Sequence, residues 1–523
     1  MKGKAKRLFT VTNLAITASA LFVVSIIPVI YLSFINRATG DDYGYGVHTH
    51  AALLATRSLS GILGAAAKTV RDHYEVWQGT WSSIFLFTLQ PEVFNDRAYV
   101  AVTIVTVTLW IAVTTFTLYY LLVRMMGFTK SGFALINALF LLVNVHFAGS
   151  NKETLFFYNG IIHYQLPYLL CLLLIGLVIC FGQRYKWRYL LAISFIAAYL
   201  GGSSYQPALL GFAVMLLAIA YFLPYKRDKR ILWLLLPLLL ETIGLIISMK
   251  APGNWARGGA GFGFGIDRAW EAILMSFVAA YRQIGSWRWH NAMSYIILVL
   301  VALAVLYTAV KSPSAAGTGG TGGRYRFPLP ILFVLATFCI YAIAAHAPEV
   351  YAGVWVSSGY ENFKFLTFAL MILADAIYLS GWFAVRCGSM ARSPAFGRLL
   401  IGAAILCGAL VPVLALFPRV DLGMGKTAFV ESYGYIRSGA AGEYRRQMEL
   451  QTAILRDEET IDAIIPYISG EQGPLMHMSA TSDPDAYTNL VMRDFYGKNS
   501  VVAIDRQEWD ELYGQAWPEG KPD

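Results

Sequence analysis

Two adjacent aspartates, Asp41 and Asp42, follow the first long apolar segment of the chain, residues 8–35, within a few positions. A carboxylate beside hydrocarbon and lipid phosphates is costly to keep ionised, so its presence there calls for an explanation. One explanation is chemical, because a carboxylate can act as a general base that removes a hydroxyl proton. The other is structural: Asp42 could accept hydrogen bonds from free N–H groups where a helix over residues 47–70 begins. The pair alone is compatible with both.

Three basic residues stand where they could meet a second reacting group. Lys250 and Arg257 flank a Pro-Gly turn after one apolar segment, and Lys364 begins another. Two cations fixed at the level of the lipid headgroups suit a phosphate. Their alternative role is anchoring, in which long basic side chains reach from the apolar region to the interface.

A further polar group follows the third apolar segment. Lys152 and Glu153 are adjacent there, and Tyr158 and His163 come shortly after them. Their types allow contacts to a polar ligand. The structural alternative is an ordinary ion pair between Lys152 and Glu153 at the membrane interface.

The composition places these residues in a membrane protein. The chain has 523 residues, of which 57% are hydrophobic and only 14% are charged. A soluble fold could not bury that much apolar surface, and apolar runs near the ~20 residues needed to cross a bilayer recur throughout. We therefore expect an all-α polytopic membrane protein with about eleven transmembrane helices, at residues 8–35, 98–124, 132–148, 166–182, 189–201, 207–224, 231–249, 291–310, 327–346, 363–383 and 399–417.

The distribution of basic residues predicts the orientation of the chain. Alternate short connections are rich in Lys and Arg, for example around residues 184–188 and 226–230, and Lys2, Lys4, Lys6 and Arg7 precede the first segment. Because basic connections stay on the cytoplasmic side, the N-terminus is expected inside and the C-terminus outside. The net charge of +9 does not indicate nucleic-acid binding, since no soluble segment carries a basic stripe with interleaved aromatics.

Two regions on the outer side should have structure of their own. Residues 36–97 form the first outer loop, whose apolar faces around 53–63 and 76–86 predict helices lying on the membrane. Residues 418–523 are far more charged than the transmembrane domain, residues 1–417. In this last part we predict a small extracytoplasmic α/β domain with helices at 440–457 and 483–496 and strands at 475–479 and 500–504.

These features together resemble a known enzyme class. The residues that carry the likeness are Gly40-Asp41-Asp42-Tyr43, the segment from Trp77 to Ser83, Ala251-Pro252-Gly253-Asn254 and the segment from Asp483 to Asn489. With the acidic pair after helix one, the interfacial helices and the closing outer domain, the chain is similar to GT-C membrane glycosyltransferases. More narrowly, it resembles bacterial O-antigen glucosyltransferases of the GtrII type.

The resemblance implies a function and a location. Such enzymes lie in the bacterial cytoplasmic membrane and move a sugar from a polyprenyl phosphate to a glycan or lipid acceptor on its outer face. Asp41 or Asp42 would be the base, and Lys250, Arg257 or Lys364 would hold the donor phosphate.

The resemblance also implies contacts around the sugar and acceptor. Tyr43, Trp77 and Trp81 could stack on sugar rings, and Lys152, Tyr158 and His163 are the other expected contacts. Glu153 matches a position that joins a divalent metal, such as Mg or Mn, in some members.

The leading alternative is a transporter or flippase for a lipid-linked or charged substrate. It would need a charged path through the membrane centre, where only Glu241 and Asp375 offer carboxylates.

Overall fold

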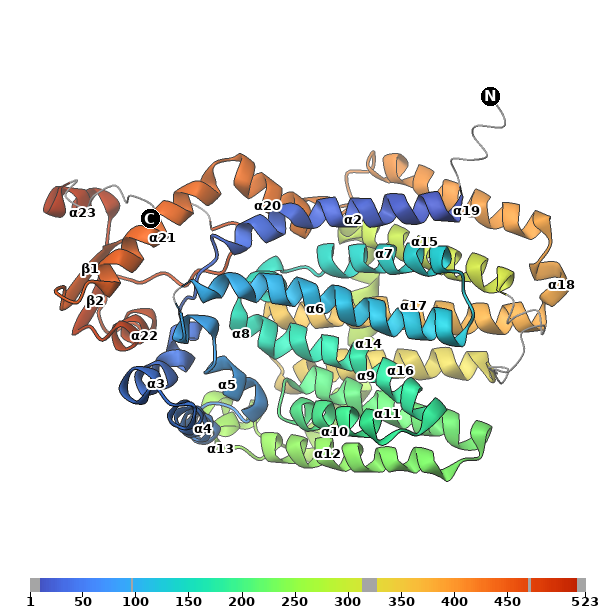
Figure 1. Cartoon of the computed structure of the whole chain (residues 1–523), viewed down its shortest axis with the longest axis horizontal. Helices are drawn as coiled ribbons and strands as arrows, with labels where there is room; N and C mark the ends of the chain where they lie inside the picture. Colours follow the sequence, from blue (N-terminus) through green and yellow to red (C-terminus); the bar gives the residue numbers. More distant parts are fainter. Residues whose placement is uncertain (1–9, 96, 313–326, 469–471, 515–523) are drawn as a thin grey trace.

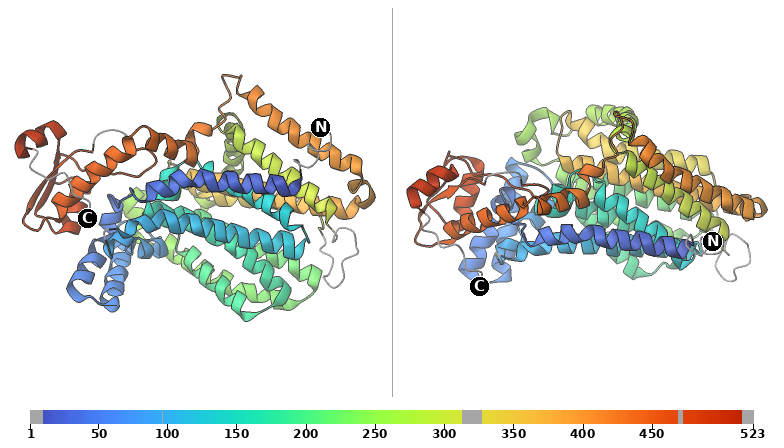
Figure 2. Two further views of the ribbon diagram at one scale, coloured as in Figure 1. Left: turned by 45° about the horizontal axis from the view of Figure 1, so that its top comes forward. Right: turned by 90° about the horizontal axis from the view of Figure 1, so that it is seen from above.

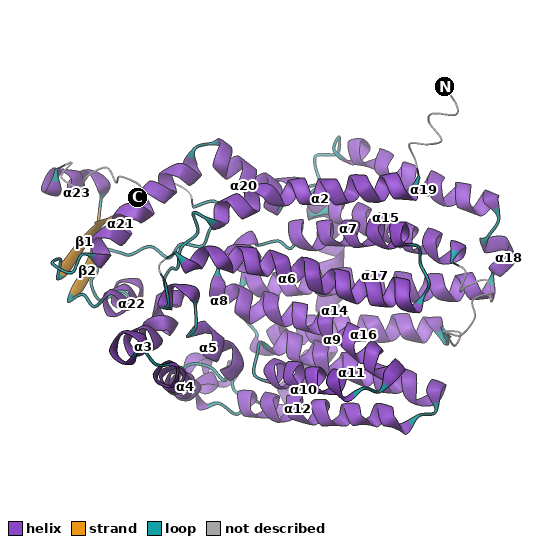
Figure 3. Ribbon diagram, viewed as in Figure 1, coloured by secondary structure: helices purple, strands orange, loops and turns teal. Residues whose placement is uncertain are grey.

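The computed structural model describes residues 10–95, 97–312, 327–468 and 472–514 (Figure 1). Within these ranges the protein is almost entirely helical, with two short strands (Figure 3). The four basic residues at the N-terminus and the first two residues of the predicted segment 8–35 lie outside the described ranges.

Nine helical segments of the described chain are long and apolar enough to cross a membrane. They are α2 (Val11–Ser33), Ala98–Met125 with α6 (Ala101–Leu118), Tyr158–Arg184 with α9 (Leu166–Arg184), α11 (Tyr205–Lys226), Lys229–Met249 with α12 (Leu235–Met249), α15 (Ala292–Lys311), α16 (Pro330–Ala352), α17 (Ser358–Arg386) and α19 (Pro394–Leu414). Two shorter apolar helices, α7 (Lys130–His146) and α10 (Trp187–Gly201), coincide with the remaining predicted segments. The chain is a multi-pass membrane protein.

Close contacts between small residues join neighbouring helices of the bundle. Where α10 and α12 meet, a Cβ on Gly201 would come within 3.1 Å of Gly244 Cα and closer still to the Glu241 carbonyl oxygen. Only glycine permits this approach of two backbones, and such contacts are a common means of helix association in lipid.

One long helix was not predicted. No helix was predicted between the spans at 231–249 and 291–310, whereas the structure has α14 (Ile266–His290) there. It crosses the direction of the other long helices (Figures 1 and 2). Its exposed apolar residues recur at Trp270, Leu274, Val278 and Tyr281, and Ala272, Ser276 and Ala280 are buried on another face. This amphipathic pattern, interrupted by charges, is that of a helix lying along an interface.

Short helices gather at one end of the bundle (Figure 1): α3 (Asp41–Thr56), α4 (Leu59–Val76), α5 (Trp81–Phe87) and α13 (Pro252–Gly258). The prediction of a single helix over residues 47–70 is wrong. Arg57 adopts a left-handed conformation with φ 47°, and the Ser58 side chain caps α4 by accepting a hydrogen bond from the Gly61 N–H at 3.1 Å. Capping of the predicted helix by Asp42 is therefore wrong too, because α3 begins at Asp41 itself.

The C-terminal part is a small α/β unit beside α3–α5 (Figure 2). It follows α20 (Ala428–Arg437) and contains α21 (Ala440–Arg456), β1 (Asp462–Pro466), α22 (Tyr487–Tyr496), β2 (Ser500–Ile504) and α23 (Arg506–Tyr513). The two strands pair in parallel, with Asp462 opposite Ser500. The prediction of a strand at 475–479 is wrong: that segment is irregular, and residues 462–466 supply the second strand.

Candidate active site

A cavity of about 450 Å³ lies where the short helices meet the membrane bundle. One part of its wall is polar, and its charged side chains are Asp41, Glu153 and Arg257. Another part is apolar and comes from four long helices, α11, α12, α14 and α16; it includes Leu209, Leu245, Met249, Ala272, Ile273 and Ile343. One hollow thus joins a charged region to a hydrocarbon-like one.

Asp41 lines this cavity from the first position of α3. Gly40 before it has φ 41°, which favours glycine, and a Cβ there would also collide with the Met478 side chain. The Oδ1 atom of Asp41 accepts a hydrogen bond from the Tyr487 hydroxyl at 2.9 Å. Burial raises the pKa of Asp41, and the Tyr487 hydrogen bond and the Arg257 charge act against that rise.

Asp42 has a different environment, although it is the next residue. Its side chain is fully buried and does not line the cavity. The Oδ2 atom accepts hydrogen bonds from the Tyr99 hydroxyl at 2.6 Å and the Thr39 N–H at 3.2 Å. Burial raises the pKa of Asp42 to about 8, despite these hydrogen bonds and aided by the charges of Asp41 and Glu92. Successive helical residues point about 100° apart, so the two carboxyls face different surroundings.

Glu153 brings a second carboxyl group to the cavity from η4 (Lys152–Phe156). Its Oε1 accepts a hydrogen bond from the Ser358 hydroxyl at 3.2 Å, and Gly160 leaves the space that Oε2 occupies. Burial raises the pKa of Glu153 to about 6, and the charge of Asp41 adds to the rise. Among the described residues, no three His, Cys, Asp or Glu side chains gather closely enough to hold a metal ion.

Arg257 is the one Lys or Arg among the described lining residues. Its guanidinium lies 4.6 Å from the centroid of the Trp77 ring and donates a hydrogen bond to Gln78 Oε1 at 2.8 Å. Asn254 Oδ1 accepts a hydrogen bond from the Gly79 N–H at 3.0 Å, which ties α13 to the segment before α5. The structure thus brings together two of the motifs singled out in the sequence. They hold a guanidinium whose remaining donors suit a phosphate.

Trp77 and His163 also line the cavity, whereas the lysines do not. Lys152 and Lys250 are exposed, and neither is part of the cavity wall. Lys364 is 4% exposed and forms ion pairs with Glu361, at 2.5 Å, and with Glu349. Lys364 faces a separate hollow between α14, α16 and α17. The two glutamates therefore neutralise its charge at a place outside the cavity that Asp41 lines.

Three aromatic residues expected to contact sugar are engaged in packing instead of lining the cavity. Tyr43 packs on Phe495, with ring centroids 4.9 Å apart. The Tyr158 hydroxyl donates to the Leu86 carbonyl at 2.9 Å, and Trp81 Nε1 donates to the Gly244 carbonyl at 3.3 Å.

The intramembrane carboxylates expected of a transporter also lie off the cavity wall. Glu241 is buried in α12 against Gly201 and Gly211. Asp375 accepts a hydrogen bond from the Thr337 hydroxyl at 2.7 Å.

Sequence reasoning missed several cavity residues. Asn159 lines the wall, is 5% exposed, and neither of its amide atoms has a hydrogen-bond partner among the described residues. Met476 and Met478 come from the segment predicted as a strand, and Tyr205 and Tyr360 come from long helices. A lone Asn or Met gives no signal of this kind in a sequence, because its role depends on what the fold places opposite it.

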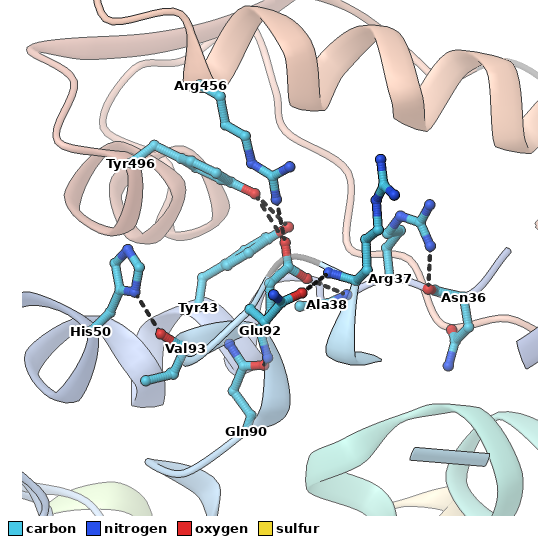
Figure 4. A network of polar contacts seen from close by, with 12 residues as sticks. Asn36, Arg37, Ala38, Tyr43, His50, Gln90, Glu92, Val93, Arg456 and Tyr496 are labelled. Atoms are coloured by element: carbon cyan, nitrogen blue, oxygen red, sulfur yellow. Dashed lines mark hydrogen bonds and ion pairs between the residues drawn. The ribbon is translucent and has the colours of Figure 1, made fainter. Parts of the chain in front are cut away.

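Glu92 is a further buried carboxylate that the sequence did not single out. Figure 4 shows it between the chain after α2 and the C-terminal part. Its Oε2 accepts the Ala38 N–H at 3.2 Å, and its Oε1 lies 3.4 Å from both the Arg456 guanidinium and the Tyr496 hydroxyl. This network holds the C-terminal unit against the end of the bundle that carries Asp41.

Comparison with known proteins gives no family assignment. No known family model matches the chain, and no curated protein sequence matches it. A carboxylate with a raised pKa, a fixed guanidinium and an adjoining apolar chamber can together bind an amphiphilic phosphate and accept a proton.

Proposed function

We propose that the protein is a membrane glycosyltransferase that takes a sugar from a polyprenyl-phosphate donor and attaches it to a cell-envelope glycan or lipid. The observation that carries the proposal is the two-part wall of the cavity, charged at Asp41, Glu153 and Arg257 and apolar between α11, α12, α14 and α16. A polyprenyl-phosphate sugar has the matching parts: a long apolar chain, one phosphate group and a polar ring.

In the proposed reaction, an acceptor hydroxyl oxygen attacks the anomeric carbon of the donor sugar. The bond from that carbon to the phosphate oxygen breaks, and the leaving polyprenyl phosphate keeps the bonding electrons. Asp41 takes the hydroxyl proton, and Arg257 stabilises the negative charge that develops on the phosphate. Asp41 suits the role of base better than Asp42, because it lines the cavity and Asp42 is buried with a pKa near 8.

Neutral polar side chains would bind the sugar ring. Asn159 and His163 line the cavity, and the Asn159 amide and His163 Nδ1 lack hydrogen-bond partners among the described residues. Buried polar groups left without partners favour a ligand that supplies them, and sugar hydroxyls both donate and accept. Trp77 supplies an aromatic surface on the same wall.

The described residues do not form a metal site of three His, Cys, Asp or Glu ligands. Asp41 and Glu153 are the two carboxylates among the described lining residues, and no third His, Cys, Asp or Glu lies close enough to complete a cluster with them. Arg257 supplies positive charge to the same cavity. Charge stabilisation in the proposed reaction therefore rests on Arg257.

The orientation follows from the basic connections. We propose eleven spans of GT-C-like arrangement, with the cavity and the C-terminal unit on the outer face of the bacterial cytoplasmic membrane. Figure 1 draws the connection with α18 (Gly388–Ala391) at the opposite end of the bundle from α3–α5, and Arg386, Arg392 and Arg398 surround it. Basic residues at that end support a cytoplasmic location for it.

The test is donor turnover by the purified protein. Protein in lipid nanodiscs is incubated with undecaprenyl phosphates carrying different radiolabelled sugars and with cell-envelope material as acceptor. We expect one donor to release undecaprenyl phosphate and to label the acceptor fraction. Absence of turnover across the series, by folded protein that also fails to bind any donor, would contradict the proposal.

A further inference from the structure

The C-terminal unit is seated directly on the helix that carries the carboxylate pair. Phe495 of α22 packs on Tyr43 and stacks on His50, with ring centroids 4.9 Å and 4.4 Å apart. Tyr496 lies 5.5 Å from Tyr43, measured between ring centroids. Gly44 makes room for the contact, because a Cβ there would come within 2.8 Å of the Tyr487 hydroxyl. These contacts fix α22 against α3.

The sheet of the same unit fixes Tyr487, the first residue of α22. Asn489 is fully buried, and its amide donates to the carbonyls of Thr481 and Val501 at 2.8 Å and 2.7 Å. Its Oδ1 accepts the Thr481 N–H at 2.8 Å. The start of α22 is thereby tied to β2, and the phenol of Tyr487 reaches Asp41 Oδ1 at 2.9 Å.

We infer that Tyr487 is the positioning residue for Asp41, so that the C-terminal unit completes the active site instead of only covering it. This inference rests on the proposed function of Asp41 as base. Tyr487 does not line the cavity itself, so it acts through the carboxylate. It holds Oδ1, whereas Oδ2 accepts no hydrogen bond from any described residue and is left to take the proton.

The phenol also favours the ionised form of Asp41, because it donates to the carboxylate. The other groups that act on Asp41 are Arg257 from α13, Glu153 from η4, and Asp42 and Tyr45 on α3; His163 lines the same cavity. Arg257 acts in the same direction as Tyr487, and Glu153 and Asp42 act against it when ionised. Without the phenol hydroxyl, one of the two groups that oppose the effect of burial is lost, so the pKa of Asp41 should rise.

The test compares Tyr487→Phe with Tyr496→Phe. Both residues are on α22 and both substitutions remove one hydroxyl, but only Tyr487 contacts Asp41. Two readouts are taken in nanodiscs: the pH dependence of sugar transfer, and the infrared band of the protonated Asp41 carboxyl, assigned by difference from Asp41→Asn. The infrared titration does not require activity.

We expect Tyr487→Phe to move the infrared midpoint and the acidic limb of the transfer profile to higher pH. Tyr496→Phe should leave both in place. An unshifted midpoint in Tyr487→Phe, or equal shifts in both variants, would overturn the inference. A shifted midpoint in a protein whose wild type transfers no sugar would overturn the proposed function, while supporting the hold of Tyr487 on Asp41.

Discussion

The two aspartates should respond very differently to the same small substitution. Asn in place of Asp keeps the size of the side chain and one carbonyl oxygen, but removes the site that accepts a proton. Asp41 lines the cavity. Asp42 is buried and accepts hydrogen bonds from the Tyr99 hydroxyl and the Thr39 N–H. Asp41→Asn should therefore abolish proton transfer, and Asp42→Asn should not.

The size of the difference follows from the protonation states. With a pKa of about 8, only about one Asp42 carboxyl in ten is ionised at pH 7. Asparagine imitates the neutral form and still offers an oxygen to Tyr99 and to the Thr39 N–H. We expect Asp42→Asn to change transfer by no more than a few-fold. Loss of the base in Asp41→Asn should cost about 10²–10⁴-fold.

The assay is the initial rate of sugar transfer per folded molecule, with folding checked by thermal unfolding in the same nanodiscs. Each variant is the control for the other, since the substitutions are identical and adjacent. Equal losses in both variants would refute the division of roles. Near-normal transfer by Asp41→Asn would refute its role as base.

Three further outcomes follow from burial and charge. The pKa of Asp42 is about 8 in the folded protein, against an ordinary aspartate value of 3.8, so its stabilising contribution is complete below about pH 4 and lost as pH rises through about 8. The unfolding temperature of the wild type should fall across that window, and Asp42→Asn should flatten the fall. Arg257→Gln should weaken donor binding about 10–100-fold by loss of a charge-assisted contact, whereas Lys250→Gln should bind normally in the same titration, because Lys250 does not line the cavity. Lys364→Met should destabilise the protein by about 1–3 kcal/mol, because two partly exposed glutamates lose their buried cation, while donor affinity per folded molecule stays unchanged.

Each of these outcomes has a contradicting result. If the unfolding temperature of the wild type falls with pH no more steeply than that of Asp42→Asn, the group that titrates in this range is not Asp42. Equal effects of the Arg257 and Lys250 substitutions on binding would favour general attraction to the membrane surface. Weaker donor binding by folded Lys364→Met would indicate that Lys364 does contribute to the donor site.

The membrane spans could be predicted because they depend on local composition. A run of about 20 apolar residues has few other structures available in a bilayer, so each predicted segment coincides with a helix. Helix α14 could not be predicted in this way, because charged residues such as Asp267, Glu271 and Arg282 interrupt its apolar face. The strand at 462–466 was missed for a different reason, since its partner, residues 500–504, is distant in sequence.

The site was predictable only in part. Asp41, Glu153 and Arg257 could be singled out because charged residues next to apolar segments are costly and therefore informative. Sequence spacing could not tell the role of Asp41 from that of Asp42. That difference depends on the hydrogen bond of Asp42 to Tyr99 and on the position of Asp41 in the cavity wall. Likewise, the basic type of Lys364 suggested a phosphate ligand, but its charge is taken by two glutamates of the folded protein.

The most direct test of the central claim is the structure of Asp41→Asn bound to a polyprenyl-phosphate sugar in nanodiscs, determined by electron cryomicroscopy. The substitution should permit binding and prevent turnover. We predict the donor phosphate within hydrogen-bond distance of the Arg257 guanidinium, the anomeric carbon facing residue 41, and the polyprenyl chain against Leu245 and Ile273 of the apolar wall. A donor bound elsewhere, or a cavity that takes only ordinary phospholipid when donor is in excess, would contradict the account.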